Sequence, residues 1–319
     1  MSPRPAAAAP SPPSLAAEPR LSGEDQSLST LASSCATATR ILLWLLLLSA
    51  VPAGADEKPT RTHLSSDGAF QLNVYEGQGG VRIEVQNLEP FPITATLTIG
   101  EQENLALSTP LPRTLIIAPK GRGDFVTLGP REATKSWRYG KVRCSYQIGS
   151  IKVRPRPFDY ELPYPVGKSY RVDQAFNGAF SHKGKNALDF ALAEGDPVTA
   201  ARGGVVVKVT DHHPQGGAEE RFRGKANRVW ILHEDGTFGC YAHFRQRKIQ
   251  VKVGAKVQVG QVLGEAGQSG FAQGPHLHFE VRYAKAGRTR AATVPITFRT
   301  AAGARQTLRE GETYERPLR

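Results

Sequence analysis

Short runs of alternating apolar and polar residues, separated by turns rich in glycine and proline, constrain this chain more than any other feature. Four such runs stand out in the first half, at residues 81–85, 93–99, 115–117 and 142–148. A period of two indicates half-buried β-strands, because successive side chains of a strand point to opposite faces. No long segment shows the 3.6-residue period of an amphipathic helix. The pattern therefore predicts an all-β chain.

The chain of 319 residues is long enough for two domains, each with its own core. The strand spacing in residues 56–165 predicts an immunoglobulin-like β-sandwich, closed by a proline-bearing connector at residues 154–165. No cluster of titratable residues stands out there, so we expect an accessory domain that positions or regulates. Residues 166–319 again alternate strand and turn, which predicts a second domain built on an antiparallel sheet.

Residues 1–55 are predicted to be a disordered leader that ends in a signal peptide. Residues 1–39 are rich in alanine, proline and serine, and residues 41–48 (ILLWLLLL) follow Arg40 and precede the small residues 53–55. An apolar run of about ten residues is shorter than the roughly 20 that a membrane span needs. We expect cleavage after Ala55, export to the periplasm or the cell exterior, and no stable membrane insertion afterwards; an uncleaved anchor is the alternative.

The chain is strongly basic, with 41 lysines and arginines against 29 acidic residues and a net charge of +12. An exported basic protein meets anionic polymers of the cell envelope before it meets nucleic acid. The charge therefore predicts attraction to the envelope and no nucleic-acid partner, with a generic solvated surface as the alternative.

Two cysteines, Cys144 and Cys240, follow the leader and fall in different predicted domains. Two cysteines cannot form a disulfide framework. We expect two buried thiols, and one interdomain bridge is the alternative.

The sequence GPHLHFEV at residues 274–281 places two histidines in a predicted strand. His276 and His278 are two residues apart, so their side chains share a face, while Leu277 and Phe279 point to the other face. Both imidazoles can then serve one site. The alternative is a polar strand face with solvent-exposed histidines.

Three further residues extend this set. Asp189 lies in an apolar strand at residues 187–192, where a carboxylate is costly unless it is paired or coordinated. His182 precedes that strand in a loop that can fold back over the same face. His243 is expected to share a strand face with Tyr241, a candidate hydrogen-bond donor to substrate.

The remaining histidines and the neighbouring cysteine receive simpler interpretations. His212 and His213 are expected in a solvated loop, and His233 at the surface. Cys240 is expected on the strand face opposite His243, so it is predicted to be neither nucleophile nor ligand.

Together, His182, Asp189, His243, His276 and His278 offer mixed nitrogen and oxygen ligands in the number that a catalytic zinc site needs. Three ligands hold Zn²⁺ and leave a fourth position open, and two more histidines can handle protons and charge. Strand geometry alone does not say which histidine of residues 276 and 278 is the ligand.

Several segments in order resemble the lysostaphin-type, LytM-like zinc metallopeptidases of the M23 family, which cleave peptide cross-links of bacterial peptidoglycan. The resemblance covers about residues 166–283 and rests on the stretch from His182 to Asp189 and on the following segments: AARGGVVVKV (200–209), NRVWILHEDG (227–236), YAHF (241–244), VKVGAKVQVGQVLGEAGQSG (251–270) and GPHLHFEV (274–281).

The resemblance implies that His182, Asp189 and His278 bind zinc and that His243 and His276 form the catalytic pair, with His243 the preferred base. It implies a zinc endopeptidase that acts on peptidoglycan. The chain departs from the common pattern in a longer segment between His182 and Asp189 and in Phe244, where leucine is usual. Two alternatives remain: a catalytically silent peptidoglycan-binding activator of a cell-wall amidase, and an envelope-binding module that uses its basic surface.

Overall fold

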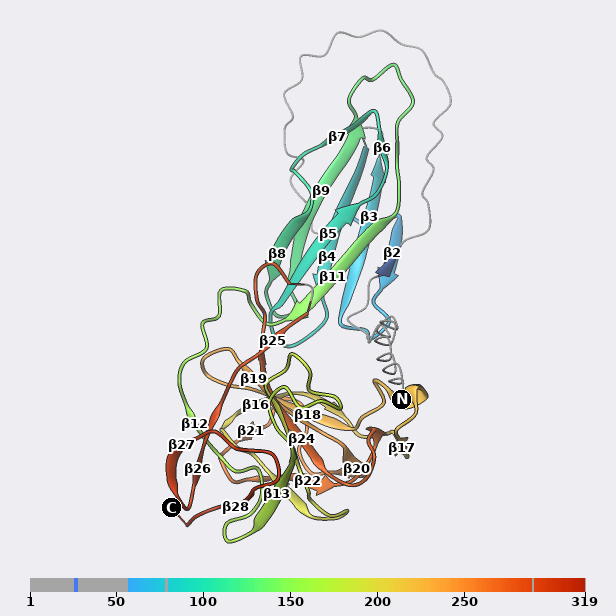
Figure 1. The fold of residues 1–319 in the computed structure, drawn as a ribbon. Helices are drawn as coiled ribbons and strands as arrows, with labels where there is room; N and C mark the ends of the chain where they lie inside the picture. The colour runs from blue at the N-terminus through green and yellow to red at the C-terminus, as the bar shows by residue number, and fades with distance from the viewer. Residues whose placement is uncertain (1–25, 28–56, 78–79, 289, 319) are drawn as a thin grey trace, which may run out of the picture.

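The computed structural model describes residues 26–27, 57–77, 80–288 and 290–318, which form two β domains stacked along one long axis (Figure 1). Among these residues the only helical element is a 3-10 turn, η1 (Glu220–Phe222). The all-β prediction is confirmed. The predicted signal run at residues 41–48 lies outside the described residues. Within the described part, no helix has the length and hydropathy needed to span a bilayer.

The N-terminal domain consists of two antiparallel sheets. One sheet has the order β2 (Arg61–Leu64), β3 (Phe70–Gly77), β4 (Gly80–Asn87), β9 (Arg122–Pro130), β7 (Leu105–Leu107). The other has the order β1 (Gln26–Ser27), β11 (Val142–Ile148), β5 (Ile93–Ile99), β8 (Arg113–Ile117). A short ribbon pairs β6 (Gln102–Glu103) with β10 (Arg138–Tyr139).

Both sheets contribute side chains to one buried core, which includes Leu72, Ile83, Leu97 and Cys144. The four strands expected from the alternating runs are confirmed, and their apolar positions supply this core. The domain is therefore a two-layer sandwich. Its assignment as immunoglobulin-like stays a prediction.

The C-terminal domain is built on a nine-stranded antiparallel sheet. Its order is β21 (Lys256–Val257), β16 (Gly204–Thr210), β18 (Arg228–Leu232), β19 (Phe238–Ala242), β24 (Leu277–Tyr283), β14 (Ala187–Phe190), β13 (Ser169–Gln174), β28 (Thr313–Glu315), with β25 (Ala292–Thr293) paired to β24.

Three smaller sheets complete this domain. One joins β15 (Pro197–Thr199), β22 (Val262–Ala266) and β20 (Phe244–Ile249); a second joins β12 (Asp159–Glu161), β26 (Thr297–Thr300) and β27 (Gly303–Gln306); a third pairs β17 (Gly216–Gly217) with β23 (Gly270–Phe271).

Strand β24 has two faces with different tasks. Leu277, Phe279 and Val281 are buried in the core of the C-terminal domain. The alternate residues, His278 and Glu280, belong to the other face, as the period of two requires. Because β24 lies between β14 and β19, this face also receives residues from both neighbouring strands.

The two domains share buried apolar contacts. Trp230, Phe238 and Cys240 of the large sheet belong to the same buried cluster as the sandwich core, and the rings of Phe238 and Phe91 meet edge to face at 5.4 Å. Cys144 and Cys240 are both buried and form no disulfide with each other, so the expectation of two buried cysteines is confirmed and the interdomain bridge does not form.

His233 is not the surface group that the sequence predicted. His233 comes directly after β18, and it is buried in the interior of the C-terminal domain with an exposed fraction of 2%. Its Nδ1 lies 2.9 Å from the carbonyl oxygen of Gly203, and its ring packs against Tyr160 at 5.9 Å. Burial, helped by the nearby charge of Arg202, lowers the pKa of His233 from 6.5 to about 4.

This burial predicts a pH dependence of stability. Since the pKa of His233 is lower in the folded state, the unfolded state takes up the proton first as the pH falls from 6.5 toward 4. The free energy of unfolding should fall across this window, by about 3 kcal/mol in total. Urea unfolding measures the free energy of unfolding near pH 7 and near pH 4. The decrease between the two pH values should be smaller in His233→Gln than in the wild type, by about this amount. An equal loss in both proteins would contradict the prediction, and His212→Gln, which alters an exposed histidine, is the control.

Candidate metal centre

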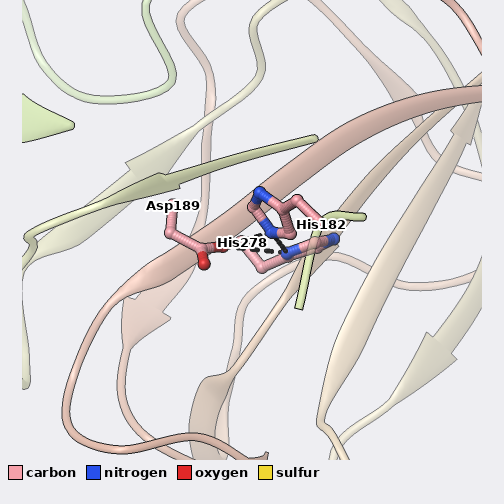
Figure 2. A group of neighbouring side chains, drawn as sticks. All are labelled: His182, Asp189 and His278. Atoms are coloured by element: carbon pink, nitrogen blue, oxygen red, sulfur yellow. Dashed lines mark hydrogen bonds and ion pairs between the residues drawn. The ribbon is translucent and has the colours of Figure 1, made fainter. Parts of the chain in front are cut away.

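Three side chains from distant parts of the chain converge on one point (Figure 2). His182 comes from the loop between β13 and β14, Asp189 from β14 and His278 from β24. His182 Nε2 lies 3.2 Å from Asp189 Oδ1 and 3.2 Å from His278 Nδ1, and His278 Nδ1 lies 2.9 Å from Asp189 Oδ1. Two imidazole nitrogens and one carboxylate oxygen thus form a small triangle.

The triangle has the size of a zinc site. In a tetrahedral site with bonds of about 2.0–2.1 Å, neighbouring ligand atoms are about 3.3 Å apart. The three distances of 3.2, 3.2 and 2.9 Å match one face of such a tetrahedron within a few tenths of an ångström. The donor set, two imidazoles and a carboxylate, is one that zinc uses in catalytic sites.

Sheet register explains how Asp189 and His278 meet. The two residues are direct partners on the adjacent antiparallel strands β14 and β24. Side chains of directly paired residues lie on the same face of a sheet, within reach of one another. The third member, His182, is outside the sheet and depends on its loop.

Hydrogen bonds orient His182. Its Nδ1 lies 3.1 Å from the carbonyl oxygen of Ala175, a distance at which an N–H donates to that oxygen. A proton at Nδ1 leaves the lone pair of Nε2 for the shared point. His182 is fully buried, so this orientation is fixed by packing.

The charges at this point favour a cation. Burial opposes ionisation of Asp189, but its polar contacts with His182 and His278 outweigh burial and hold the pKa of the carboxyl well below its usual value. Burial likewise lowers the pKa of His278, but its bonds to Asp189 and Glu280 outweigh it and raise the pKa to about 9. Without metal, a proton on His278 therefore neutralises the carboxylate. A metal ion would displace that proton.

His243 and His276 stand beside the triangle. Their rings are 4.4 Å apart, and the ring of His243 is 6.0 Å from that of His278. His276 Nε2 lies 3.8 Å from Asp189 Oδ1. The structure thus brings together all five residues that the sequence singled out.

The route by which His243 reaches the site differs from the prediction. His243 follows the end of β19 and has φ of +72°, a left-handed conformation that is uncommon for residues other than glycine. The strand alternation therefore stops before His243, and its side chain does not share a face with Tyr241. Its Nδ1 lies 2.6 Å from the carbonyl oxygen of Ser269, which fixes the ring.

Tyr241 does not face the pocket, so its predicted role as a substrate-side donor is wrong. The side chain is fully buried in the core of the C-terminal domain, and its hydroxyl accepts a hydrogen bond from the backbone N–H of Ala201 at 2.8 Å. Cys240 is buried as well, which raises the pKa of its thiol to about 12. A thiol with this pKa is neither a nucleophile nor a ligand at neutral pH.

The triangle opens into a pocket of about 450 Å³. Phe180 and Phe271, whose rings stack at 5.7 Å, line the pocket with His243, His276 and the loop at residues 272–275. Phe180 is 53% exposed, so this aromatic wall is open to solvent. A peptide segment could therefore approach the three converging ligand atoms.

Gln174, which the sequence analysis missed, holds two of the three candidate ligands. Its Nε2 donates to Asp189 Oδ2 at 2.9 Å, and its Oε1 accepts from the backbone N–H groups of Ser181 at 2.9 Å and His182 at 3.3 Å. The side chain is buried at the end of β13. Only its position beside a loop that folds back reveals this function, and the local sequence carries no signal for it.

We expect Gln174→Ala to weaken zinc binding by about 10- to 100-fold, because outer-shell hydrogen bonds that orient metal ligands contribute on this scale. Competition with a chromophoric chelator measures the dissociation constant. Gln147→Ala, which removes another buried glutamine in the sandwich, is the matched control. Equal zinc affinity in Gln174→Ala and the wild type would contradict the prediction.

Comparison with known proteins gives a family for this region. Residues 183–290 match the profile of peptidase family M23. Over 124 residues the chain is 36% identical to peptidoglycan DD-endopeptidase ShyA of Vibrio cholerae. This match covers 37% of this chain and 26% of ShyA. Over 142 residues the chain is 32% identical to glycyl-glycine endopeptidase ALE-1 of Staphylococcus capitis. This match covers 44% of this chain and 33% of ALE-1. The chain thus spans about a quarter to a third of these relatives.

Among solved structures, the chain is similar to the catalytic domain of the prophage-encoded M23 protein EnpA from Enterococcus faecalis. The sequence identity is 27%, the TM-score is 0.30, and the match covers 41% of this chain and 92% of the EnpA chain.

Proposed function

We propose that this chain, whose residues 183–290 match the profile of peptidase family M23, is a zinc-dependent endopeptidase that hydrolyses peptide cross-links of bacterial peptidoglycan. The observation that carries the proposal is the triangle of His182, Asp189 and His278, whose atoms are spaced as zinc ligands at the base of an open pocket. The names of the relatives, a peptidoglycan DD-endopeptidase and a glycyl-glycine endopeptidase, support the substrate class.

In this proposal His182, Asp189 and His278 hold the zinc ion. When bound, zinc supplies Lewis-acid charge beside the scissile carbonyl and lowers the pKa of water at the site. Asp189 contributes a charge that is already ionised, because its pKa is held low. Gln174 holds the second oxygen of this carboxylate, so that Oδ1 stays directed at the triangle.

His243 and His276 manage protons and developing charge. Burial, together with the nearby His276 and His278, lowers the pKa of His243 to about 3, so the ring is neutral at neutral pH. With its Nδ1 proton donated to Ser269, the lone pair of Nε2 is available to accept a proton from water. His276 Nδ1 lies 2.9 Å from the carbonyl oxygen of Gly274. We assign His243 as the base and His276 as the group that stabilises the oxyanion.

The proposal includes the setting of the enzyme. Residues 1–55 form a leader with a signal peptide, within which β1 pairs with β11. Residues 56–165 form an accessory sandwich with its linker, and residues 166–319 the peptidase domain of an exported protein in the cell envelope. Net basic charge supports attraction to anionic envelope polymers. The buried contacts between Phe91 and Phe238 support a fixed placement of the sandwich beside the peptidase sheet.

Incubation with purified peptidoglycan sacculi tests the proposal. We expect soluble peptide-containing fragments to be released, the release to stop when a chelator removes zinc, and added zinc to restore it. Mass spectrometry of the fragments identifies the bond that is cut. Binding to sacculi without metal-dependent fragments would overturn the enzyme and favour the silent activator of an amidase.

A further inference from the structure

Glu280 occupies a buried position directly behind one of the candidate ligands. It lies two residues after His278 on β24, on the same face of the sheet, and is 2% exposed. Its Oε1 lies 3.5 Å from His278 Nε2, the ring nitrogen that points away from the triangle. Carboxylates this deeply buried are rare unless they have a partner or a task.

The orientation of the His278 ring requires a hydrogen-bond acceptor beside Nε2, and Glu280 can supply it. Since Nδ1 faces Asp189 and His182, a metal ion at the triangle would take the lone pair of Nδ1. A neutral imidazole then carries its proton on Nε2 and must donate it to an acceptor. The carboxylate of Glu280 is the acceptor that the structure places beside Nε2.

Arg282 keeps this acceptor charged and in place. Its Nε donates to Glu280 Oε1 at 2.7 Å, and its Nη2 contacts the same oxygen. Among the described residues, no donor reaches Oε2 of Glu280, although this atom is buried. The carboxylate therefore has an unused acceptor atom, which a small rotation would offer to the Nε2 proton of His278.

We propose that Glu280 is a positioning residue of the metal centre, which accepts the Nε2 proton of His278 and so directs Nδ1 at the metal. It matches the backbone carbonyl of Ala175 behind His182, which holds Nδ1 of that ring and frees Nε2. The two histidines thus present opposite ring nitrogens to one ion, each fixed by an acceptor behind it. Such carboxylate and histidine pairs raise the basicity of a ligand and fix its ring.

Zinc affinity tests this inference, which rests on the proposed metal site. We expect zinc binding, measured by chelator competition on the full chain, to weaken about 10- to 100-fold in Glu280→Ala. Glu280→Gln retains an oxygen acceptor and should fall between Glu280→Ala and the wild type. Glu84→Ala removes a buried glutamate of the sandwich that accepts from Asn73 and lies near two arginines, and it should bind zinc as the wild type does.

A second measurement separates positioning from general packing. In zinc-loaded protein labelled with ¹⁵N at histidine, the Nε2 proton of His278 should give a protected NMR signal, which exchanges rapidly with water in Glu280→Ala and is recovered in Glu280→Gln. Zinc affinity within about twofold of the wild type in folded Glu280→Ala overturns the inference. If Glu280→Ala does not fold, the inference is overturned when Glu280→Gln binds zinc with wild-type affinity and leaves the Nε2 proton unprotected. A wild-type chain that binds no zinc overturns the proposed function instead.

Discussion

Replacing His278 by alanine is expected to abolish tight zinc binding and to lower the rate of cross-link cleavage by about 10⁴-fold or more. The residue offers one of three candidate ligand atoms, and two ligands do not close a catalytic zinc site. A bound zinc ion lowers the barrier of hydrolysis by several kcal/mol, and about 5.5 kcal/mol corresponds to 10⁴-fold. Metal analysis of the purified variant and fragment release from sacculi measure the two effects.

The matched control is His212→Ala, which removes an exposed histidine from the loop that precedes β17. This variant should keep about one zinc per chain and the wild-type rate. Circular dichroism should show that both variants remain folded. Fragment release at the wild-type rate by zinc-free His278→Ala would refute the assignment of this residue as a ligand.

The second large effect is expected at His243. Replacing it by asparagine should lower the cleavage rate by about 10²- to 10⁴-fold, the range of general acid–base catalysis, while zinc content stays the same. Asparagine suits this position because it tolerates the left-handed φ of +72° better than alanine, so the backbone is preserved. Its shorter side chain cannot bring a nitrogen to the position of Nε2, the atom assigned as the base.

Zinc content distinguishes this result from loss of the metal site. A variant that loses both zinc and activity would show that His243 supports the centre structurally, which contradicts the assigned role. A variant that keeps zinc and cleaves as fast as the wild type would remove His243 from the mechanism. His276→Asn, assayed in the same way, tests the second member of the pair.

Much of the fold and of the site could be predicted because both depend on short periodicities. The alternating runs gave the strands of the sandwich, since half-buried strands need an apolar side chain at every second position. The same periodicity placed His276 and His278 on one face. The structure brings both histidines to one pocket, and Leu277 and Phe279 to the core.

The errors arose where the periodicity ends. Tyr241 and His243 are two residues apart, but the left-handed backbone at His243 breaks the alternation, so one ring is buried in the core and the other lines the pocket. His233 lies next to a turn, which suggested exposure, yet the chain folds over it and leaves it 2% exposed. Neither a left-handed residue nor burial by a distant segment leaves a local pattern.

The sequence by itself determined the all-β class, the set of five residues that the structure brings together, and the resemblance to one peptidase family. Only the tertiary structure decided which atoms converge, because that depends on the pairing of β14 with β24 and on a loop that Gln174 holds in place. It also decided the partners behind the site, such as Glu280, whose role depends on which nitrogen of His278 points at the triangle. Residue types and their spacing are local properties of a chain, whereas the orientation of a ring is set by contacts among segments far apart in it.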